Sequence, residues 1–246
     1  MIFERTFSAV RIALAPLLST LACVASGAAA QEAPSLNGYV TVANGYWSRG
    51  LSQNNDLSVQ LGIDYQQKRG WFVGARAANV EYEAEQSWEE PREIEAEVYG
   101  GYHRRSEDWS WTLMLGRYYY PDASVAYDWD EFSATVGFRD RVYYTASYTD
   151  QFYGLWRSAL NQELSFAVPL RAYFEIGGTL GHFAVSATPV DYSYWNLGVS
   201  KVVRRVVLDL RYYESGYDYV GSFGDPNGTQ YVFSVSYALR GNKPRI

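Results

Sequence analysis

Apolar and polar residues alternate along most of this chain, from about residue 37 to about residue 240. The segment 57–66 is the clearest example, because Leu57, Val59 and Leu61 are separated by small or polar residues. A period of two is typical of a β-strand, in which successive side chains point to opposite faces. Strands in soluble proteins are mostly about 5 to 6 residues long, whereas a tilted strand that crosses a bilayer needs about 9 to 11. The long alternating segments therefore favour strands that span a membrane.

Twelve such segments predict an all-β fold, a transmembrane antiparallel up-and-down β-barrel of about 12 strands, in one domain over residues 31–246. An even number of strands lets both chain ends lie on the same side, as in single-chain bacterial barrels. Closure also leaves no unpaired sheet edge in lipid. The predicted strands are 37–50, 56–67, 70–82, 92–104, 108–120, 127–139, 141–150, 158–168, 170–183, 190–203, 206–215 and 228–240.

The connections between these segments alternate in length, as expected for a barrel with short periplasmic turns and longer external loops. The short turns are mostly basic, whereas the longer loops lean acidic. The short connections are 67–70, 104–108, 139–141, 168–170 and 203–206, and the longer ones are 83–92, 120–127, 150–158, 184–191 and 214–228.

The first thirty residues predict a signal peptide, cleaved after Ala30. Arg5 and Arg11 precede an apolar run over 12–24, and small residues follow it. Cys23 leaves a lipoprotein signal as the alternative, although the small residues before Gln31 form the better cleavage site. Cleavage would remove the only cysteine, so the mature chain would hold neither a disulfide nor a thiolate site.

Composition narrows the class of protein further. The chain carries a formal net charge of −6, so nucleic acid is not an expected partner. It contains 23 Tyr and 8 Trp, the residues that outer-membrane barrels concentrate at the two lipid–water boundaries. No second apolar run long enough for a membrane helix follows the first. The lipid bilayer of the outer membrane is therefore the expected partner and location.

The two faces of the predicted strands differ in polarity. We assign the apolar face to lipid and the polar face to a lumen, whereas a soluble barrel would have the opposite arrangement. The phase of strands 37–50, 70–82 and 190–203 stays ambiguous, because glycines there can mark bulges. The candidate pore-lining residues are Arg49, Asp64, Arg76, Glu93, Glu95, Glu97, Glu131, Arg139, Arg171, Glu175, Asp209 and Arg211.

Glu93, Glu95 and Glu97 lie at alternate positions of one predicted strand and therefore on one face. One interpretation is a charged ladder along a pore, which favours cations. The other is that barrel interiors hold charges that pair across strands, here with arginines such as Arg76. Acids outnumber bases among the candidates, which indicates a weak preference for small, cationic, hydrophilic solutes.

Four segments carry a resemblance to a known family: NGYWSRGLSQ at 44–53, VQLGIDY at 59–65, GWFVGARAANVEY at 70–82 and GRYYYPDA at 116–123. They resemble the TorF family of proteobacterial porin-like proteins. The resemblance implies an outer-membrane barrel and a channel, and it implies neither a substrate nor binding residues. The chain departs from many outer-membrane proteins in its last residues, which are not aromatic.

The pair Arg49–Gly50 within the first of these segments has two interpretations. In the structural one, Gly50 supplies a positive φ or a close fit, and Arg49 pairs with an acid such as Asp64. In the functional one, Arg49 is a fixed charge at the mouth of the pore. The structural interpretation is the one we favour.

Two alternatives to a channel remain. The first is an outer-membrane hydrolase, but neither His103 nor His182 has a serine at the spacing that would place both on one strand face. No metal or cofactor motif is present in the sequence either, so none is expected. The second is a structural or adhesive barrel, plugged by aromatic or arginine side chains, because twelve strands enclose only a narrow lumen.

Overall fold

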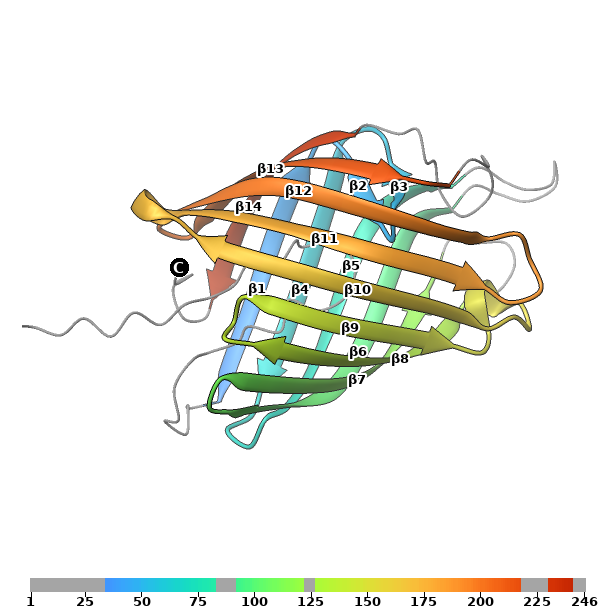
Figure 1. Cartoon of the computed structure of the whole chain (residues 1–246), viewed down its shortest axis with the longest axis horizontal. Coiled ribbons are helices and arrows are strands. Elements are labelled where there is room, and N and C mark those ends of the chain that lie inside the picture. Colours follow the sequence, from blue (N-terminus) through green and yellow to red (C-terminus); the bar gives the residue numbers. More distant parts are fainter. Residues whose placement is uncertain (1–33, 83–91, 122–126, 218–229, 241–246) are drawn as a thin grey trace, which may run out of the picture.

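Twelve strands close into one antiparallel barrel in the computed structural model, which describes residues 34–82, 92–121, 127–217 and 230–240 (Figure 1). The expected signal peptide lies outside these residues. Around the barrel the order is β1-β14-β13-β12-β11-β10-β9-β8-β7-β6-β5-β4. The strands are β1 (Ser35–Ala43), β4 (Ser58–Gln66), β5 (Trp71–Tyr82), β6 (Arg92–Ser106), β7 (Trp109–Tyr119), β8 (Trp129–Phe138), β9 (Val142–Thr149), β10 (Ala159–Pro169), β11 (Phe174–Val185), β12 (Asp191–Val203), β13 (Val206–Ser215) and β14 (Tyr231–Arg240).

Strand β1 closes the barrel by pairing with the next barrel strand on one side and the last on the other. Val40 lies opposite Leu61 of β4 and also opposite Tyr237 of β14. Every barrel strand therefore has two neighbours, and the sheet has no free edge. The predicted twelve-stranded barrel is confirmed.

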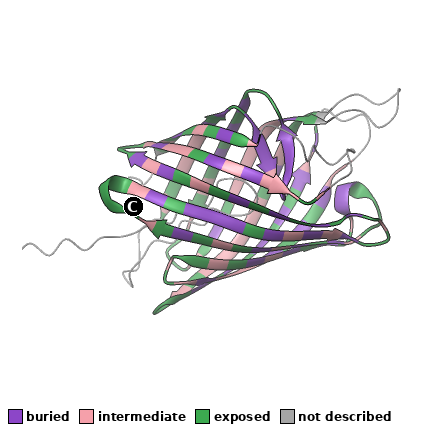
Figure 2. Cartoon of the chain, turned by 45° about the horizontal axis from the view of Figure 1, so that its top comes forward, coloured by how far each residue is buried: buried purple, intermediate pink, exposed green. Residues whose placement is uncertain are grey.

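The outer face of the barrel is the apolar one. Along β4, Val59 and Leu61 are 39% and 49% exposed, whereas Gln60 between them is 6% exposed. The same alternation of buried and exposed residues runs along most strands (Figure 2). A soluble barrel would bury its apolar side chains inside. This barrel is inverted, as the sequence predicted.

Aromatic side chains gather near both rims of the outer face. At one end, Trp71 packs against Tyr102, with ring centroids 5.1 Å apart. At the other, Tyr212 lies between Trp195 and Tyr231, at 5.4 and 4.9 Å. Two such bands are expected where an apolar belt meets two water boundaries.

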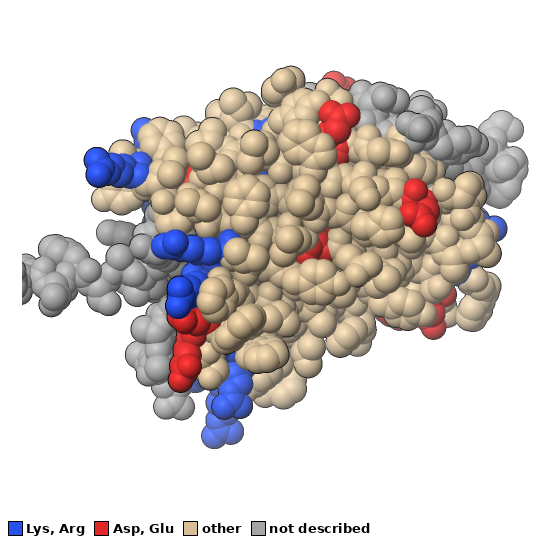
Figure 3. Space-filling model, viewed as in Figure 1, with Lys and Arg blue, Asp and Glu red and all other residues tan. Residues whose placement is uncertain are grey.

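Short turns and long connections lie at opposite ends of the barrel, as predicted (Figure 1). We call these the short-turn end and the long-loop end. Lys and Arg side chains gather at the short-turn end in Figure 3. No helix among the described residues is long and apolar enough to cross a membrane.

Two strand boundaries differ from the prediction by four residues or more. β1 ends at Ala43 rather than at residue 50, and the chain after it turns into the barrel. β11 begins at Phe174 rather than at residue 170, because Arg171–Tyr173 forms a single 3-10 turn, η2, in which Ala172 has a φ of 59°. Both differences change the placement of predicted lumen residues.

Candidate functional site

The connection between β1 and β4 folds into the lumen as a small hairpin. Its strands β2 (Tyr46–Ser48) and β3 (Leu51–Asn54) pair with each other and form a sheet separate from the barrel. Trp47 is 1% exposed and Leu51 is 3% exposed, so the hairpin is buried inside. We call residues 46–54 the lumen hairpin. It contains most of the sequence segment 44–53.

The turn of the lumen hairpin consists of Arg49 and Gly50, which both have a positive φ, 51° and 78°. Gly50 also lies so close to Tyr194 of β12 that a Cβ would overlap its side chain. The predicted role of Gly50, a positive φ and a close fit, agrees with this geometry. A glycine here lets the hairpin turn sit against the barrel wall.

Arg49 reaches from the hairpin to β8, where its Nη2 donates to Oε2 of Glu131 at 2.5 Å. Its Cζ lies 5.2 Å from the ring centroid of Trp129 and 5.6 Å from that of Phe183. Burial by itself would lower the pKa of the Arg49 guanidinium, but Glu131 and the nearby tyrosines Tyr118 and Tyr194 together outweigh burial, and the pKa is raised above its ordinary value. The guanidinium is therefore a permanent cation held by a carboxylate and two aromatic faces.

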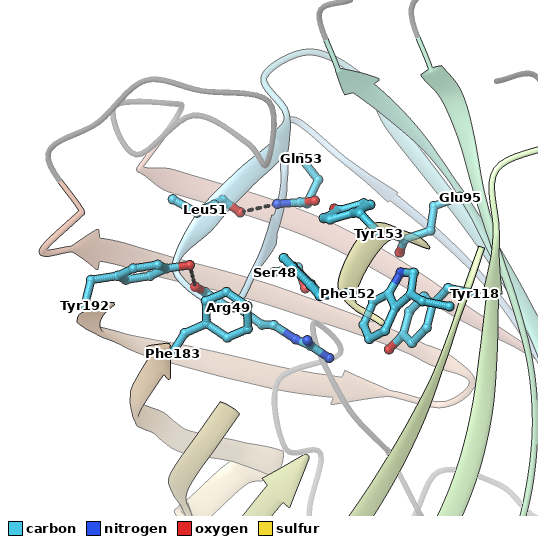
Figure 4. A pocket seen from close by; sticks show the side chains of 11 residues that line it. Ser48, Arg49, Leu51, Gln53, Glu95, Tyr118, Phe152, Tyr153, Phe183 and Tyr192 are labelled. Carbon is cyan, nitrogen blue, oxygen red and sulfur yellow. Dashed lines mark hydrogen bonds between the residues drawn. The ribbon is translucent and has the colours of Figure 1, made fainter. Parts of the chain in front are cut away.

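Further side chains hold the rest of the hairpin. The Tyr192 hydroxyl donates to the Arg49 carbonyl at 2.8 Å (Figure 4), and the Tyr46 hydroxyl donates to Oε1 of Glu95 at 3.1 Å. Trp47 stacks on Tyr213, with ring centroids 5.3 Å apart. These contacts join the hairpin to β6, β12 and β13 through side chains.

A second inward segment meets the hairpin. It is the 3-10 turn η1 (Phe152–Gly154), between β9 and β10, and Phe152 and Tyr153 are each 5% exposed. Phe152 contacts the rings of Trp129 and Phe183, at 5.2 Å in both cases. A cavity of about 30 Å³ remains among these groups, with the residues labelled in Figure 4 around it. That volume suits about one water molecule, so the hairpin and η1 pack closely where they meet.

The other lumen arginines are also paired. Arg76 of β5 forms an ion pair with Glu97, its register partner on β6, and donates to the Tyr118 hydroxyl at 3.1 Å. Arg211 donates to Asn196 at 2.8 Å and to Asp209 at 3.1 Å. Glu97 therefore belongs to an ion pair between neighbouring strands and not to an open ladder of acids.

Many large lumen side chains lie opposite glycines. Tyr39 faces Gly62, Tyr99 faces Gly74, Tyr143 faces Gly137, Tyr194 faces Gly181 and Arg211 faces Gly198 across neighbouring strands. A Cβ on any of these glycines would come within 3 Å of the side chain opposite. Each large side chain therefore lies flat over a glycine rather than pointing to the lumen axis.

The structure places two predicted lumen residues elsewhere. Arg139 and Arg171 lie in turns at the short-turn end, and both are exposed. Arg139 pairs there with Asp108 at 3.0 Å. The predicted strands extended one residue beyond the end of β8 and three or more residues before the start of β11, and these extensions include Arg139 and Arg171. The prediction that Asp64 pairs with Arg49 is also wrong, because Asp64 accepts from Asn37 at 2.8 Å.

The remaining predicted residues lie on the lumen side of their strands. Glu93 is exposed near the long-loop end, Glu95 accepts from Tyr46 and Tyr120, and Glu175 is 5% exposed with no hydrogen bond to Oε1. Carboxylates outnumber guanidinium groups on the inner face of the barrel. The carboxylates there are Asp64, Glu93, Glu95, Glu97, Glu131, Glu163, Glu175 and Asp209, and the guanidinium groups are Arg49, Arg76, Arg105 and Arg211.

The sequence prediction missed the lumen hairpin and η1. A signal for the hairpin was present, since the segment 44–53 places Arg49–Gly50 between two aromatic residues and a polar run. No comparable signal marked Phe152 and Tyr153. Among the described residues, no group of three or more His, Cys, Asp or Glu side chains could hold a metal ion.

Comparison with known proteins places the chain in a family. The model of a family described as bacterial proteins of unknown function, Gcw_chp, matches residues 27–235. The chain belongs to the Gcw_chp family. The segment 44–53 and the lumen hairpin both lie within the matched part of this Gcw_chp chain. The likeness to the TorF family remains a resemblance, because the matching model does not carry that label.

The solved structure of the KdgM porin supports the fold of the Gcw_chp chain. The KdgM porin is 10% identical and has a TM-score of 0.50, with 84% of this chain and 99% of that chain covered. The COG4313 outer membrane channel from Pseudomonas putida F1 is 9% identical and has a TM-score of 0.47, with 85% and 96% covered. No curated protein matches the sequence.

Proposed function

We propose that this chain is an outer-membrane, porin-like channel for small hydrophilic solutes, with a preference for cations. In this proposal the lumen hairpin closes the long-loop half of the channel and moves when solute passes. The observation that carries it is the inverted barrel, which is closed, apolar outside and charged inside.

Membrane insertion is supported by the outer surface. In water, the apolar side chains of all twelve strands would be exposed to solvent. A bilayer covers them, with a gain in free energy of roughly 25 cal/mol per Å² of apolar surface. Both aromatic bands lie where such a belt would meet headgroups. Similarity in fold to the KdgM porin agrees with an outer-membrane location. The long-loop end then faces outward and the short-turn end faces the periplasm.

Solute passage is supported by the form of the lumen. Tyr39, Tyr99 and Arg211 lie flat over glycines, so the wall carries large polar side chains without filling the axis. The lumen hairpin has no place in the barrel sheet, and its removal would leave all twelve strands paired. The closure is therefore separable from the barrel.

A preference for cations is supported by the charge balance. Asp64 and Glu95 are bonded to neutral groups, Asn37 and two tyrosines, so their charge is not cancelled by an arginine bonded to them. In a narrow, water-filled lumen with walls of low dielectric constant, uncompensated carboxylates raise the local concentration of cations.

Single-channel recording tests this function. The mature chain is refolded, inserted into a planar bilayer, and recorded in a KCl gradient with and without the lumen hairpin. Ohmic steps in at least one form, with a reversal potential on the cation side, are the expected result. Absence of current from both forms would overturn the channel proposal.

A second candidate is a plugged structural or adhesive barrel. It is favoured by one observation, the aromatic packing of Phe152 and Tyr153 against Trp129 and Phe183 inside the lumen. In that case the barrel would pass no current in any recording, and the external loops would carry the function.

A further inference from the structure

The side chains around the guanidinium group of Arg49 have the chemistry of a binding site for an organic cation. Glu131 supplies a carboxylate at 2.5 Å, and Trp129 and Phe183 supply aromatic faces at 5.2 and 5.6 Å from Cζ. A planar guanidinium suits this combination, because it can donate to a carboxylate in its plane and stack on rings above and below.

The walls of this site belong to the barrel, whereas its occupant does not. Trp129 and Glu131 lie on β8 and Phe183 lies on β11, so barrel pairing holds all three in place. Arg49 belongs to the lumen hairpin, and within the described part of the chain β2 and β3 pair only with each other. Withdrawal of the hairpin would empty the site without disturbing its walls.

The site also retains unused hydrogen-bonding capacity. Oε1 of Glu131 and Nε1 of Trp129 are buried and have no hydrogen-bond partner, in side chains that are 1% and 3% exposed. Arg49 therefore uses one of the two Glu131 oxygens, although a guanidinium can engage both. The cavity of about 30 Å³ that Trp129 lines leaves some room beside the occupant. A free guanidinium, not tethered to a hairpin, could fit the carboxylate better than Arg49 does.

We propose that Glu131, Trp129 and Phe183 form a lumen site for solutes that carry a guanidinium group, and that Arg49 is its tethered occupant. The inference rests on the proposed channel function and names the solute class of that channel. Solute and Arg49 compete for one site, so bound solute favours the state in which the hairpin is withdrawn. A short tether gives Arg49 an effective concentration in the millimolar range, which a solute must match or exceed.

The test uses the Arg49→Ala variant, which removes the tethered guanidinium and leaves the walls intact. Methylguanidinium chloride at about 10 mM is the probe, chosen to match the effective concentration of a short tether. Sodium chloride at the same ionic strength is the reference salt. Binding is followed by the thermal unfolding of the barrel in detergent, and passage by single-channel current.

The expected result is that methylguanidinium raises the unfolding temperature of Arg49→Ala and reduces its current, whereas sodium does neither. Affinity should fall by about tenfold or more in the Arg49→Ala/Glu131→Gln double variant, which corresponds to about 1.4 kcal/mol. Arg76→Ala is the matched control, because Arg76 also pairs with a lumen glutamate but lies on β5. The probe should leave that variant unchanged.

Equal responses of Arg49→Ala and Arg76→Ala, or no response of Arg49→Ala, would overturn the inference. If Arg49→Ala conducts but ignores the probe, the inference fails and the channel function stands. If it binds the probe but no form conducts, the site stands and the channel function fails. Should Arg49→Ala not refold alone, refolding with methylguanidinium replaces the assay: recovery supports the site, and lack of recovery refutes it.

Discussion

Arg49 and Glu131 lie 82 positions apart in the sequence and are joined inside the barrel by a hydrogen bond of 2.5 Å between charged groups. The bond connects the turn of the lumen hairpin to β8, and both side chains are more than nine-tenths buried. The hairpin is thereby fixed by a buried charge pair inside the lumen. In the proposed channel, the strength of this pair decides how firmly the hairpin closes the long-loop half.

Replacing Glu131 with Gln should destabilise the barrel by about 3 to 5 kcal/mol, because it leaves the Arg49 charge buried without a counter-charge. Unfolding by urea in lipid vesicles measures this loss. The control is Arg139→Gln, which breaks an exposed pair with Asp108 and should change the free energy of unfolding by about 1 kcal/mol or less. A similar loss in both variants would contradict the special role of the buried pair.

Tyr192→Phe removes one hydrogen bond to the hairpin, the bond from the Tyr192 hydroxyl to the Arg49 carbonyl. The ring packing is kept, so the closed state should lose about 1 kcal/mol and the barrel little else. Open events in single-channel records should therefore become about fivefold more frequent. An unchanged frequency would show that this contact does not hold the hairpin.

Gly62→Ala should destabilise the barrel by about 1 to 3 kcal/mol and lower its conductance, because the added methyl group overlaps the Tyr39 ring and pushes it toward the lumen axis. Gly38→Ala on the neighbouring strand is the matched control, since a Cβ there meets only ordinary contacts of 3.5 Å or more. Urea unfolding and single-channel conductance measure the two effects. Equal behaviour of the two variants would show that Tyr39 does not need a glycine at position 62 to lie flat against the barrel wall.

Asp64→Asn combined with Glu175→Gln should move the reversal potential in a KCl gradient toward zero, because it removes two lumen carboxylates and keeps their shape. Asp108→Asn at the short-turn end removes an acid outside the lumen and serves as the control. A reversal potential that stays at the value of the unmodified chain would rule out these acids as the source of cation preference.

The barrel could be predicted from the sequence because each strand carries its own signal. Residues 57–66 alternate whatever the rest of the chain does, and the polarity of each face follows from the same alternation. The sequence signal for the point at which a strand ends and a turn begins is weaker, and this is why Arg139 and Arg171 were assigned to the lumen. Both follow the alternation in sequence, but the chain has already turned at these positions.

The lumen hairpin could not be predicted in the same way. Residues 46–54 are buried on both sides inside the barrel, so they lack one exposed face and look like a continuation of β1. The partner of Arg49 depends on which strands face each other across the lumen, and alternation holds no information on that. Asp64 was the nearer acid in sequence, yet closure of the barrel brought Glu131 to the hairpin instead.

The most direct measurement replaces the lumen hairpin, residues 46–54, with a short Gly-Ser linker and records single-channel currents beside those of the unmodified mature chain. All twelve barrel strands keep their partners in this variant. We expect frequent ohmic steps of larger conductance in the variant and small or rare steps in the unmodified chain. A folded, inserted variant that passes no more current than the unmodified chain would contradict this expectation.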